Sequence, residues 1–156
     1  MSDGAKRYSW EKKKRTMLRF IKPGDFFCFL LPSGKFGCGR VISKVSVGHS
    51  AEFYPSPLDE PVLWENWANS GVSFYDVLDS YSLFDRRLEG DWRIVGSADI
   101  EEKKVYREVF FVYGSSGGRY KVNLMGQECE CSEEEYRALP PYRPAGNANI
   151  LSRMGF

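Results

Sequence analysis

Histidine and cysteine are scarce in this chain, and their scarcity limits the chemistry it can perform. Its 156 residues include one histidine, His49, and four cysteines. The cysteine spacings do not match the paired ligands of a zinc site, so we expect no metal and no other cofactor. We expect all four to be buried free thiols, as in a reducing cytosol. They are Cys28, Cys38, Cys129 and Cys131.

Long apolar runs are also absent. The longest, residues 26–31, has six residues, whereas a membrane-spanning helix needs about 20. No apolar segment follows the basic N-terminus, as it would in a secretory signal. We therefore expect a cytoplasmic protein without a membrane segment. A chain of this length is expected to form one domain.

The charge of the chain divides into two unlike parts. The whole chain has 22 Lys and Arg against 21 Asp and Glu, a net charge of +1. Residues 1–22 hold eight basic and two acidic residues, whereas residues 23–156 hold 14 basic and 19 acidic ones. The sequence therefore predicts a basic N-terminal arm, residues 1–20, followed by a single acidic β-rich domain, residues 21–156.

Strand patterns dominate this domain. Five strands are expected, the first two and the last two forming hairpins, with the third at a sheet edge; a turn and a further short strand are expected within residues 82–96. The five strands are residues 26–31, 36–46, 72–78, 105–113 and 120–124. A helix is expected at 6–20, another at 61–68, and a third after Ser132, which forms a capping box with Glu135. Residues 48–61 are expected to be a loop and 140–156 an irregular tail. The predicted fold class is mostly β (α+β), an antiparallel, hairpin-rich twisted sheet or partly open barrel with two or three short helices.

Catalytic motifs find little support in the sequence. His49 lies in the expected loop without a nucleophile-elbow motif, which indicates a solvated histidine; a hydrolase built around His49 is a third hypothesis. The glycine-rich residues 114–118 lack the ending of a phosphate-binding loop and favour a hairpin turn. No spacing singles out a pair of carboxylates. We therefore expect no catalytic residue and no enzyme activity.

Acidic and aromatic residues alternate between positions 59 and 91, where eight acids accompany two arginines. Acids steer the encounter with a basic protein, and desolvated aromatics anchor it. The candidate binding residues are Asp76, Asp79, Tyr81, Asp85, Glu89 and Asp91. Five glutamates between Glu128 and Glu135 are the second choice. The alternative is that the aromatics form the core and the acids only solvate one face.

The basic arm supports a rival function. Lys12, Lys13, Lys14 and Arg15 lie near Tyr8 and Trp10, a combination that grips phosphates and stacks bases. A small β-barrel nucleic-acid-binding protein is therefore the alternative. The acidic body would repel nucleic acid, so this alternative is the less favoured one.

The segment 21–42, IKPGDFFCFLLPSGKFGCGRVI, resembles the opening hairpin of immunity protein family 26. Members of that family have a Pro-Gly-Asp turn, a strand, a short Gly-containing turn and an aromatic-Gly-x-Gly-Arg-Val strand. The resemblance extends through Phe74-Tyr75-Asp76-Val77, Trp92-Arg93-Ile94-Val95-Gly96 and Glu134-Glu135-Tyr136. We interpret the hairpin matches as structural, serving a turn and close packing. They are Pro23, Gly24, Asp25, Gly37, Gly39 and Arg40.

This resemblance implies a bacterial immunity protein of a polymorphic-toxin or contact-dependent inhibition system. Such a protein acts in the cytosol and neutralises a cognate toxin by binding its C-terminal domain. The toxin is often a basic nuclease, whose active site the immunity protein would cover. The resemblance supplies no catalytic residue.

Overall fold

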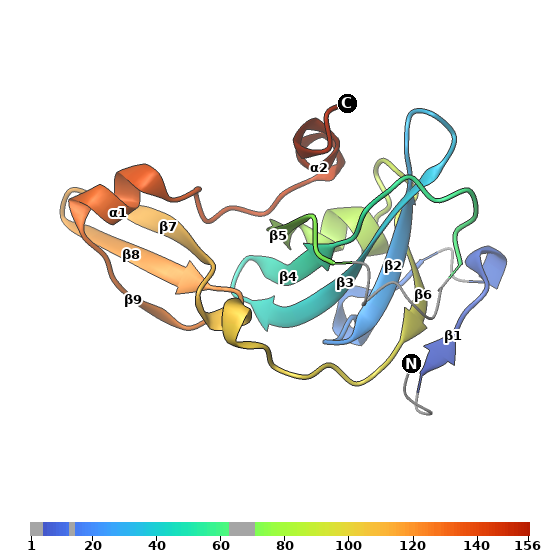
Figure 1. Cartoon of the computed structure of the whole chain (residues 1–156), viewed down its shortest axis with the longest axis horizontal. Helices are drawn as coiled ribbons and strands as arrows, with labels where there is room; N and C mark the ends of the chain where they lie inside the picture. The colour runs from blue at the N-terminus through green and yellow to red at the C-terminus, as the bar shows by residue number, and fades with distance from the viewer. Residues whose placement is uncertain (1–4, 13–14, 63–70) are drawn as a thin grey trace.

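Two antiparallel sheets make up the part of the chain that the computed structural model describes, residues 5–12, 15–62 and 71–156 (Figure 1). The larger sheet has the strand order β1-β6-β2-β3-β4-β5 and the smaller one β7-β8-β9. Because β1 and β5 end the larger sheet without pairing to each other, the sheet is open. The predicted mostly β fold class with antiparallel sheets and short helices is confirmed.

The strand bounds are β1 Lys6–Arg7, β2 Asp25–Leu30, β3 Phe36–Val45, β4 Gly48–Phe53, β5 Phe74–Leu78, β6 Arg93–Ser97, β7 Phe110–Ser115, β8 Gly118–Asn123 and β9 Glu128–Glu130. Helix α1 spans Glu133–Ala138 and α2 spans Asn147–Arg153. Shorter helical turns are η1 Trp10–Lys12, η2 Leu18–Phe20, η4 Tyr81–Asp85 and η5 Lys104–Arg107.

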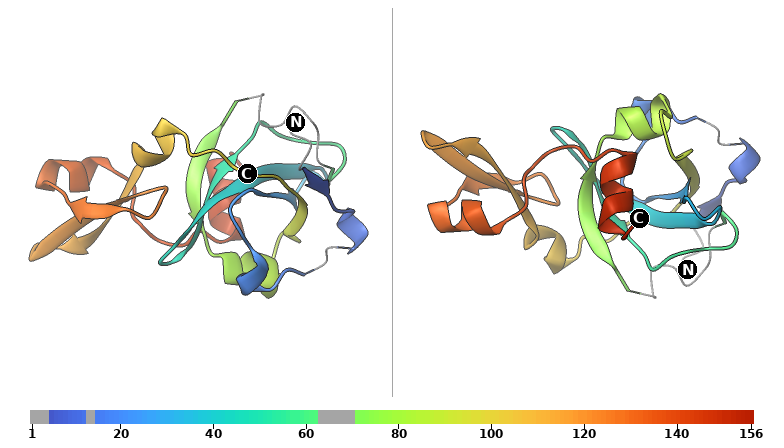
Figure 2. Two further views of the ribbon diagram at one scale, coloured as in Figure 1. Left: turned by 90° about the horizontal axis from the view of Figure 1, so that it is seen from below. Right: turned by 90° about the horizontal axis from the view of Figure 1, so that it is seen from above.

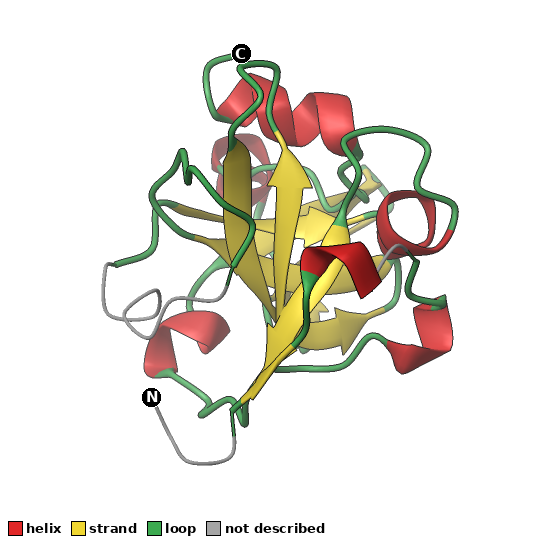
Figure 3. Ribbon diagram, turned by 90° about the vertical axis from the view of Figure 1, so that its right-hand side faces the viewer, coloured by secondary structure: helices red, strands yellow, loops and turns green. Residues whose placement is uncertain are grey.

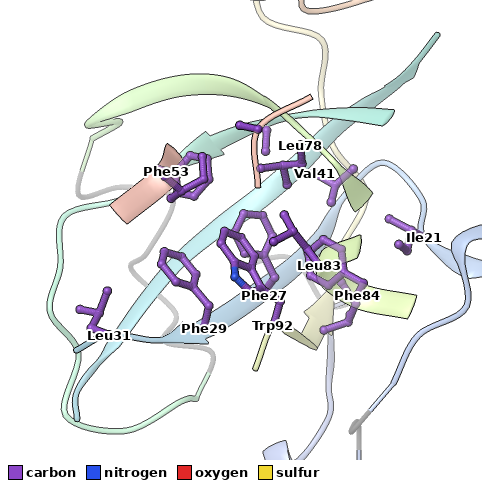
Figure 4. Close-up of a cluster of buried hydrophobic side chains, with 14 residues drawn as sticks. Ile21, Phe27, Phe29, Leu31, Val41, Phe53, Leu78, Leu83, Phe84 and Trp92 are labelled. Carbon is purple, nitrogen blue, oxygen red and sulfur yellow. The ribbon is translucent and has the colours of Figure 1, made fainter. Parts of the chain in front are cut away.

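Strand β2 lies inside the larger sheet, between β6 and β3, and its first five residues are buried. A strand covered on both faces needs apolar side chains in succession rather than in alternation, which is why the run 26–31 forms it. Phe27 and Phe29 point into one core with Trp92, whose ring stacks on Phe29 with the centroids 4.0 Å apart (Figure 4). Phe26 and Cys28 lie in a second core on the opposite face.

Close packing of β3 against β2 depends on two glycines. A Cβ atom at Gly37 would lie 2.4 Å from Cζ of Phe29, and one at Gly39 would lie 2.6 Å from Cζ of Phe27. Both distances are far below van der Waals contact, so the aromatic rings of β2 occupy the space that side chains on β3 would need. Arg40, which follows, donates 2.8 and 2.9 Å hydrogen bonds to the carbonyl oxygens of Ala98 and Asp99.

One face of the larger sheet is covered by η4 and α2 (Figure 2). Leu83 and Phe84 of η4 and Ile150 of α2 are buried in the same core as the aromatic rings of β2. Figure 3 shows these helices around the strands of the larger sheet. The segment 81–92 and the C-terminal helix therefore both contribute buried side chains to the hydrophobic core.

The smaller sheet joins the larger one through a third apolar cluster. Ile42 and Val77 of the larger sheet pack there with Tyr106, Phe111 and Leu124. Beyond this contact the smaller sheet projects from the body, with α1 on one of its faces (Figure 1). The hairpin predicted for this region is confirmed, although β7 begins at Phe110 and residues 104–107 form a helical turn instead of a strand.

The prediction of a helix at residues 6–20 is wrong. Lys6 and Arg7 form β1, which pairs with Ser97 and Gly96 of β6, and in the described residues up to position 20 it is followed by the short turns η1 and η2. The apolar side chains of this segment do not repeat with a helical period, so they cannot form one helical stripe. They pack individually instead: Tyr8 lies against the aromatic core.

Two further expectations are wrong for the same reason: contacts with distant residues stabilise a strand and a helix that the local sequence does not favour. Residues 48–53 are strand β4 instead of a loop, and the predicted irregular tail contains α2. In β4 the polar Ser50 is buried and donates a 2.5 Å hydrogen bond to the carbonyl of Leu124. In α2, Ile150 is buried, and Met154, four residues on, packs against the same core. The edge position of β5 is confirmed; most of the helix predicted at 61–68 lies outside the described residues.

Candidate functional site

His49 lies on β4 and is 1% exposed, so the expectation of a solvated loop histidine is wrong. Its Nδ1 is 2.7 Å from Oγ of Ser80, which is also buried. Burial, followed by the charge of Lys44, lowers the pKa of His49 to about 4. The imidazole is therefore neutral near pH 7 and forms a polar contact inside the core, where no substrate reaches it.

The four cysteines fall into two environments. Cys28 and Cys38 are buried free thiols that face each other across β2 and β3, and burial raises the pKa of Cys38 to about 12. Cys129 is exposed and Cys131 half-buried, so the expectation of burial is wrong for Cys129. Within the described ranges, no group of three or more His, Cys, Asp or Glu side chains could hold a metal ion.

Asp76, the first of the predicted binding residues, is bound within the molecule. Its Oδ2 accepts a 3.0 Å hydrogen bond from Nη1 of Arg153 in α2, and its Oδ1 accepts a 2.8 Å hydrogen bond from the backbone N–H of Val77. Arg153 also donates to the carbonyl of Tyr75 at 2.8 Å. The carboxylate thus fixes α2 against the edge strand β5.

Asp85 and Asp91 have internal partners as well. Oδ1 of Asp85 accepts hydrogen bonds of 2.8 and 2.6 Å from Nε and Nη2 of Arg15, and this pairing lowers the pKa of Asp85 below its usual value. Asp91 accepts two hydrogen bonds from Arg93, at 2.9 and 2.7 Å, and lies 3.3 Å from Nη2 of Arg87. Their charges are therefore largely compensated within the chain.

Tyr81 and Glu89 are exposed, whereas Asp79 is half-buried and its carboxylate accepts hydrogen bonds of 3.3 and 2.8 Å from the backbone N–H and the hydroxyl of Ser82. Asp79 and Glu89 line a pocket of about 260 Å³ beside the start of α2. Leu88, also in its lining, is 61% exposed, and Tyr81 is 48% exposed. Of the six predicted residues, these three offer the surface on which a partner could still act. Phe84 and Trp92 are buried in the core, as the alternative interpretation of the aromatics expected.

The described residues of the N-terminal arm lie against the body. The ring of Trp10 is covered by the guanidinium of Arg93, 4.3 Å from its centroid, and meets Phe36 edge-on at 5.2 Å. Arg15 is held by Asp85. The aromatic that would stack on a base, and one cation that would hold a phosphate, are thus engaged within the chain. Lys13 and Lys14 lie outside the described residues.

A groove of about 710 Å³ separates β5, the edge of the larger sheet, from β7, the edge of the smaller one. The chain crosses between the two edges where Pro141 bridges to Val112 and Ala145 bridges to Leu78. The charged groups on the β5 wall, from Asp76 and Arg153, already bind each other. We therefore interpret the groove as the junction between the two sheets rather than as a binding site.

A surface that the sequence singled out only in part, through Glu128 and Glu130 of the second-choice glutamates, lies on the smaller sheet, on the side opposite α1. Tyr113 of β7 stacks on Tyr120 of β8 with a centroid distance of 5.4 Å, and Tyr142 lies 5.9 Å from Tyr113 on its other side. Glu130 of β9 is the register partner of Tyr120, and Glu128 accepts a hydrogen bond from the hydroxyl of Tyr113. We name these five residues the tyrosine–glutamate face.

The sequence contained a signal for this face. Tyr113 and Tyr120 lie on the two strands expected to form the second hairpin, and a hairpin register that pairs them places them on one side. The missing information was the position of Tyr142, which lies in the segment predicted to be irregular, and the pairing of β9, for which no strand was predicted.

Comparison with known proteins gives one informative match. Residues 22–121, well over half of the chain, match the model of the family described as Immunity protein 26. This span runs from the residue before the Pro23-Gly24-Asp25 turn into β8. No curated protein and no solved structure matches the chain. None of the helices in the described part of the chain is long and apolar enough to cross a membrane.

Proposed function

The chain belongs to the immunity protein 26 family, and on that premise we propose that it binds the toxic domain of a secreted bacterial protein and covers its active site. The family match confirms the resemblance of the first hairpin and supports a toxin-neutralising role. It is the observation that carries this proposal. The bacterium that makes the chain would thereby survive toxin delivered by neighbouring cells.

The charge distribution supports a basic toxin, and we propose a nuclease. Residues 23–156 hold 19 acidic against 14 basic residues. A nuclease must hold phosphate, so its cleft presents cations, and an acidic protein is attracted to such a cleft. The neighbouring strands β2 and β3 carry the buried free thiols Cys28 and Cys38 on the same face, which suits action in the reducing cytoplasm.

Binding, rather than chemistry, is the proposed mode of action. The buried pair of His49 and Ser80 is closed to substrate. A binding inhibitor works stoichiometrically, because each copy occupies one toxin molecule. An enzyme that inactivated the toxin would act at far less than one equivalent.

A titration tests this proposal directly. The toxin domain encoded beside this chain is purified and mixed with increasing amounts of the chain, and nucleic-acid cleavage and complex formation are measured together. We expect cleavage to fall linearly and to end at one equivalent, with a one-to-one complex in gel filtration. The absence of a complex at micromolar concentration would overturn the proposal.

Two other outcomes of the titration would each refute one part of the proposal. A toxin domain that binds the chain but cleaves no nucleic acid refutes the nuclease assignment and leaves neutralisation intact. Full inactivation of the toxin by one tenth of an equivalent refutes the stoichiometric mechanism and favours an enzyme. Carrying His49→Gln through the same titration then decides whether that enzyme uses His49.

A further inference from the structure

We propose that the tyrosine–glutamate face of the smaller sheet is the surface on which the chain binds its basic toxin. This inference rests on the proposed function and assigns that function a location. It commits to one occupant, a cationic protein surface that presents arginine and lysine side chains.

The smaller sheet separates its charges by face. Arg119 and Lys121 of β8 point to the side of α1, where Lys121 lies 2.6 Å from Glu135 and Arg119 pairs with Glu133. Side chains alternate along a strand, so their neighbour Tyr120 points to the opposite side. The register places Glu128 opposite Val122 and Glu130 opposite Tyr120. Both glutamates therefore lie on the face away from the two cations of the sheet.

Glu130 is the freer of the two carboxylates. It is exposed, and among the described residues it has no ion-pair partner. Its negative charge thus faces solvent uncompensated, unlike those of Asp76, Asp85 and Asp91, which have arginine partners. An uncompensated charge at the surface attracts an incoming cation more effectively than one already paired.

The tyrosines form a row that is held in place before any partner arrives. Tyr113 stacks on Tyr120 and donates its hydroxyl proton to a hydrogen bond with Glu128, which raises the pKa of Tyr113 to about 12. The hydroxyl of Tyr142 lies 2.8 Å from Oγ of Ser46 in the turn after β3. Side chains already fixed lose little conformational freedom on binding, so contact with them costs less.

The row nevertheless remains accessible. Tyr113 is 37% exposed, Tyr120 and Tyr142 are half-buried, and the end of β7 beyond Tyr113 is exposed. Nearer the body, Phe111 on the same face is buried against the larger sheet, and Val122 beside it is also buried. On this face the apolar core therefore continues outward as a surface of tyrosine rings with polar hydroxyl groups. Aromatic side chains of this kind are enriched at the centres of protein interfaces.

A cationic partner uses both components of the face. Arginine and lysine bind to carboxylates, and their charged groups also stack over tyrosine rings. The chain itself shows this preference on the other side of the same sheet, where Arg119 lies 4.1 Å from the ring centroid of Tyr136. A row of tyrosines ending in a free glutamate therefore suits the phosphate-binding surface of a nuclease.

The test measures association and dissociation rates between the purified basic toxin domain encoded beside this chain and variants of the chain. Glu130→Lys is expected to slow association roughly tenfold at low salt, since it replaces attraction by repulsion. Tyr120→Ala is expected to weaken binding roughly 30-fold, mainly through faster dissociation, as expected for an anchor residue. Thermal unfolding shows whether each variant folds. If Tyr120→Ala does not fold, Tyr120→Phe replaces it in the binding measurement.

Two charge reversals test the rival candidate surfaces. Glu134→Lys alters an exposed glutamate of α1, and Glu89→Lys alters the pocket beside α2; if the tyrosine–glutamate face is the interface, neither slows association as much as Glu130→Lys does. If Glu89→Lys slows association and Glu130→Lys does not, the interface lies at the pocket and this inference is overturned. If both Glu130→Lys and Tyr120→Ala bind like the wild type, it is also overturned. Failure of the wild-type chain to bind overturns the proposed function instead.

Discussion

Protonation of His49 should make the stability of the protein depend on pH in a range where few other groups titrate. The pKa of His49 is about 4 in the folded chain, against an ordinary value of 6.5. Between these values the unfolded chain binds a proton that the folded chain does not. Lowering the pH through this window therefore favours the unfolded state, and stability is restored as the pH rises above 6.5.

The size of the effect follows from the two pKa values. Proton linkage gives a loss of about 2.5 kcal/mol in the free energy of unfolding between pH 7 and pH 4.5. Because the chain has a single histidine, the contribution belongs to one side chain. The carboxylates also begin to titrate near pH 4.5, so a variant without His49 is needed to isolate the contribution of this histidine.

The assay is urea unfolding at several pH values for the wild type and for His49→Gln, which retains a polar group that cannot titrate. The difference in unfolding free energy between the two proteins should change by about 2.5 kcal/mol over this range. Parallel curves from pH 7.5 to pH 4.5 would refute the reasoning. So would an imidazole proton resonance of the folded protein that titrates near pH 6.5.

Two substitutions test the packing of the larger sheet. Gly39→Ala places a Cβ atom 2.5 Å from the carbonyl oxygen of Glu52 and should lower stability by about 1–3 kcal/mol. Gly117→Ala is its control, because nothing lies within 4 Å of the added Cβ; equal effects of the two would contradict the steric argument. Trp92→Ala removes a fully buried ring and should cost about 3–5 kcal/mol, whereas Tyr81→Ala, at an exposed ring, should cost far less. Urea unfolding measures all four.

The larger hairpin could be predicted because its sequence signals are local. A continuous apolar run, a Pro-Ser-Gly-Lys turn and a glycine-containing strand determine β2 and β3 without reference to the rest of the chain. The capping box of α1 is equally local, since Ser132 and Glu135 satisfy each other's backbone groups. Each of these predictions uses contacts within about 20 residues.

Strand β4 and helix α2 could not be predicted because their support comes from distant residues. His49 and Ser50 look like loop residues until Ser80 and the carbonyl of Leu124 provide hydrogen-bond partners. Helix α2 has few good helix formers, and burial of Ile150 in the aromatic core stabilises it.

The internal partners of the predicted acidic binding residues could not be predicted for the same reason. Sequence spacing shows that acids cluster between residues 59 and 91, but it does not show which arginines reach them. Arg15 is 70 residues from Asp85 along the chain, and Arg153 is 77 residues from Asp76. Such distant pairings decide whether a carboxylate is free to meet a partner, and only the fold reveals them.

The bonded pair of Asp76 and Arg153 also protects the edge of the larger sheet. Strand β5 ends the larger sheet, and an edge strand with free backbone groups invites pairing with another chain. Here Asp76 accepts from the N–H of Val77, and Arg153 donates to the carbonyl of Tyr75. Two side chains thus occupy backbone groups that a second strand would use. Pairing of two copies through this edge is therefore disfavoured.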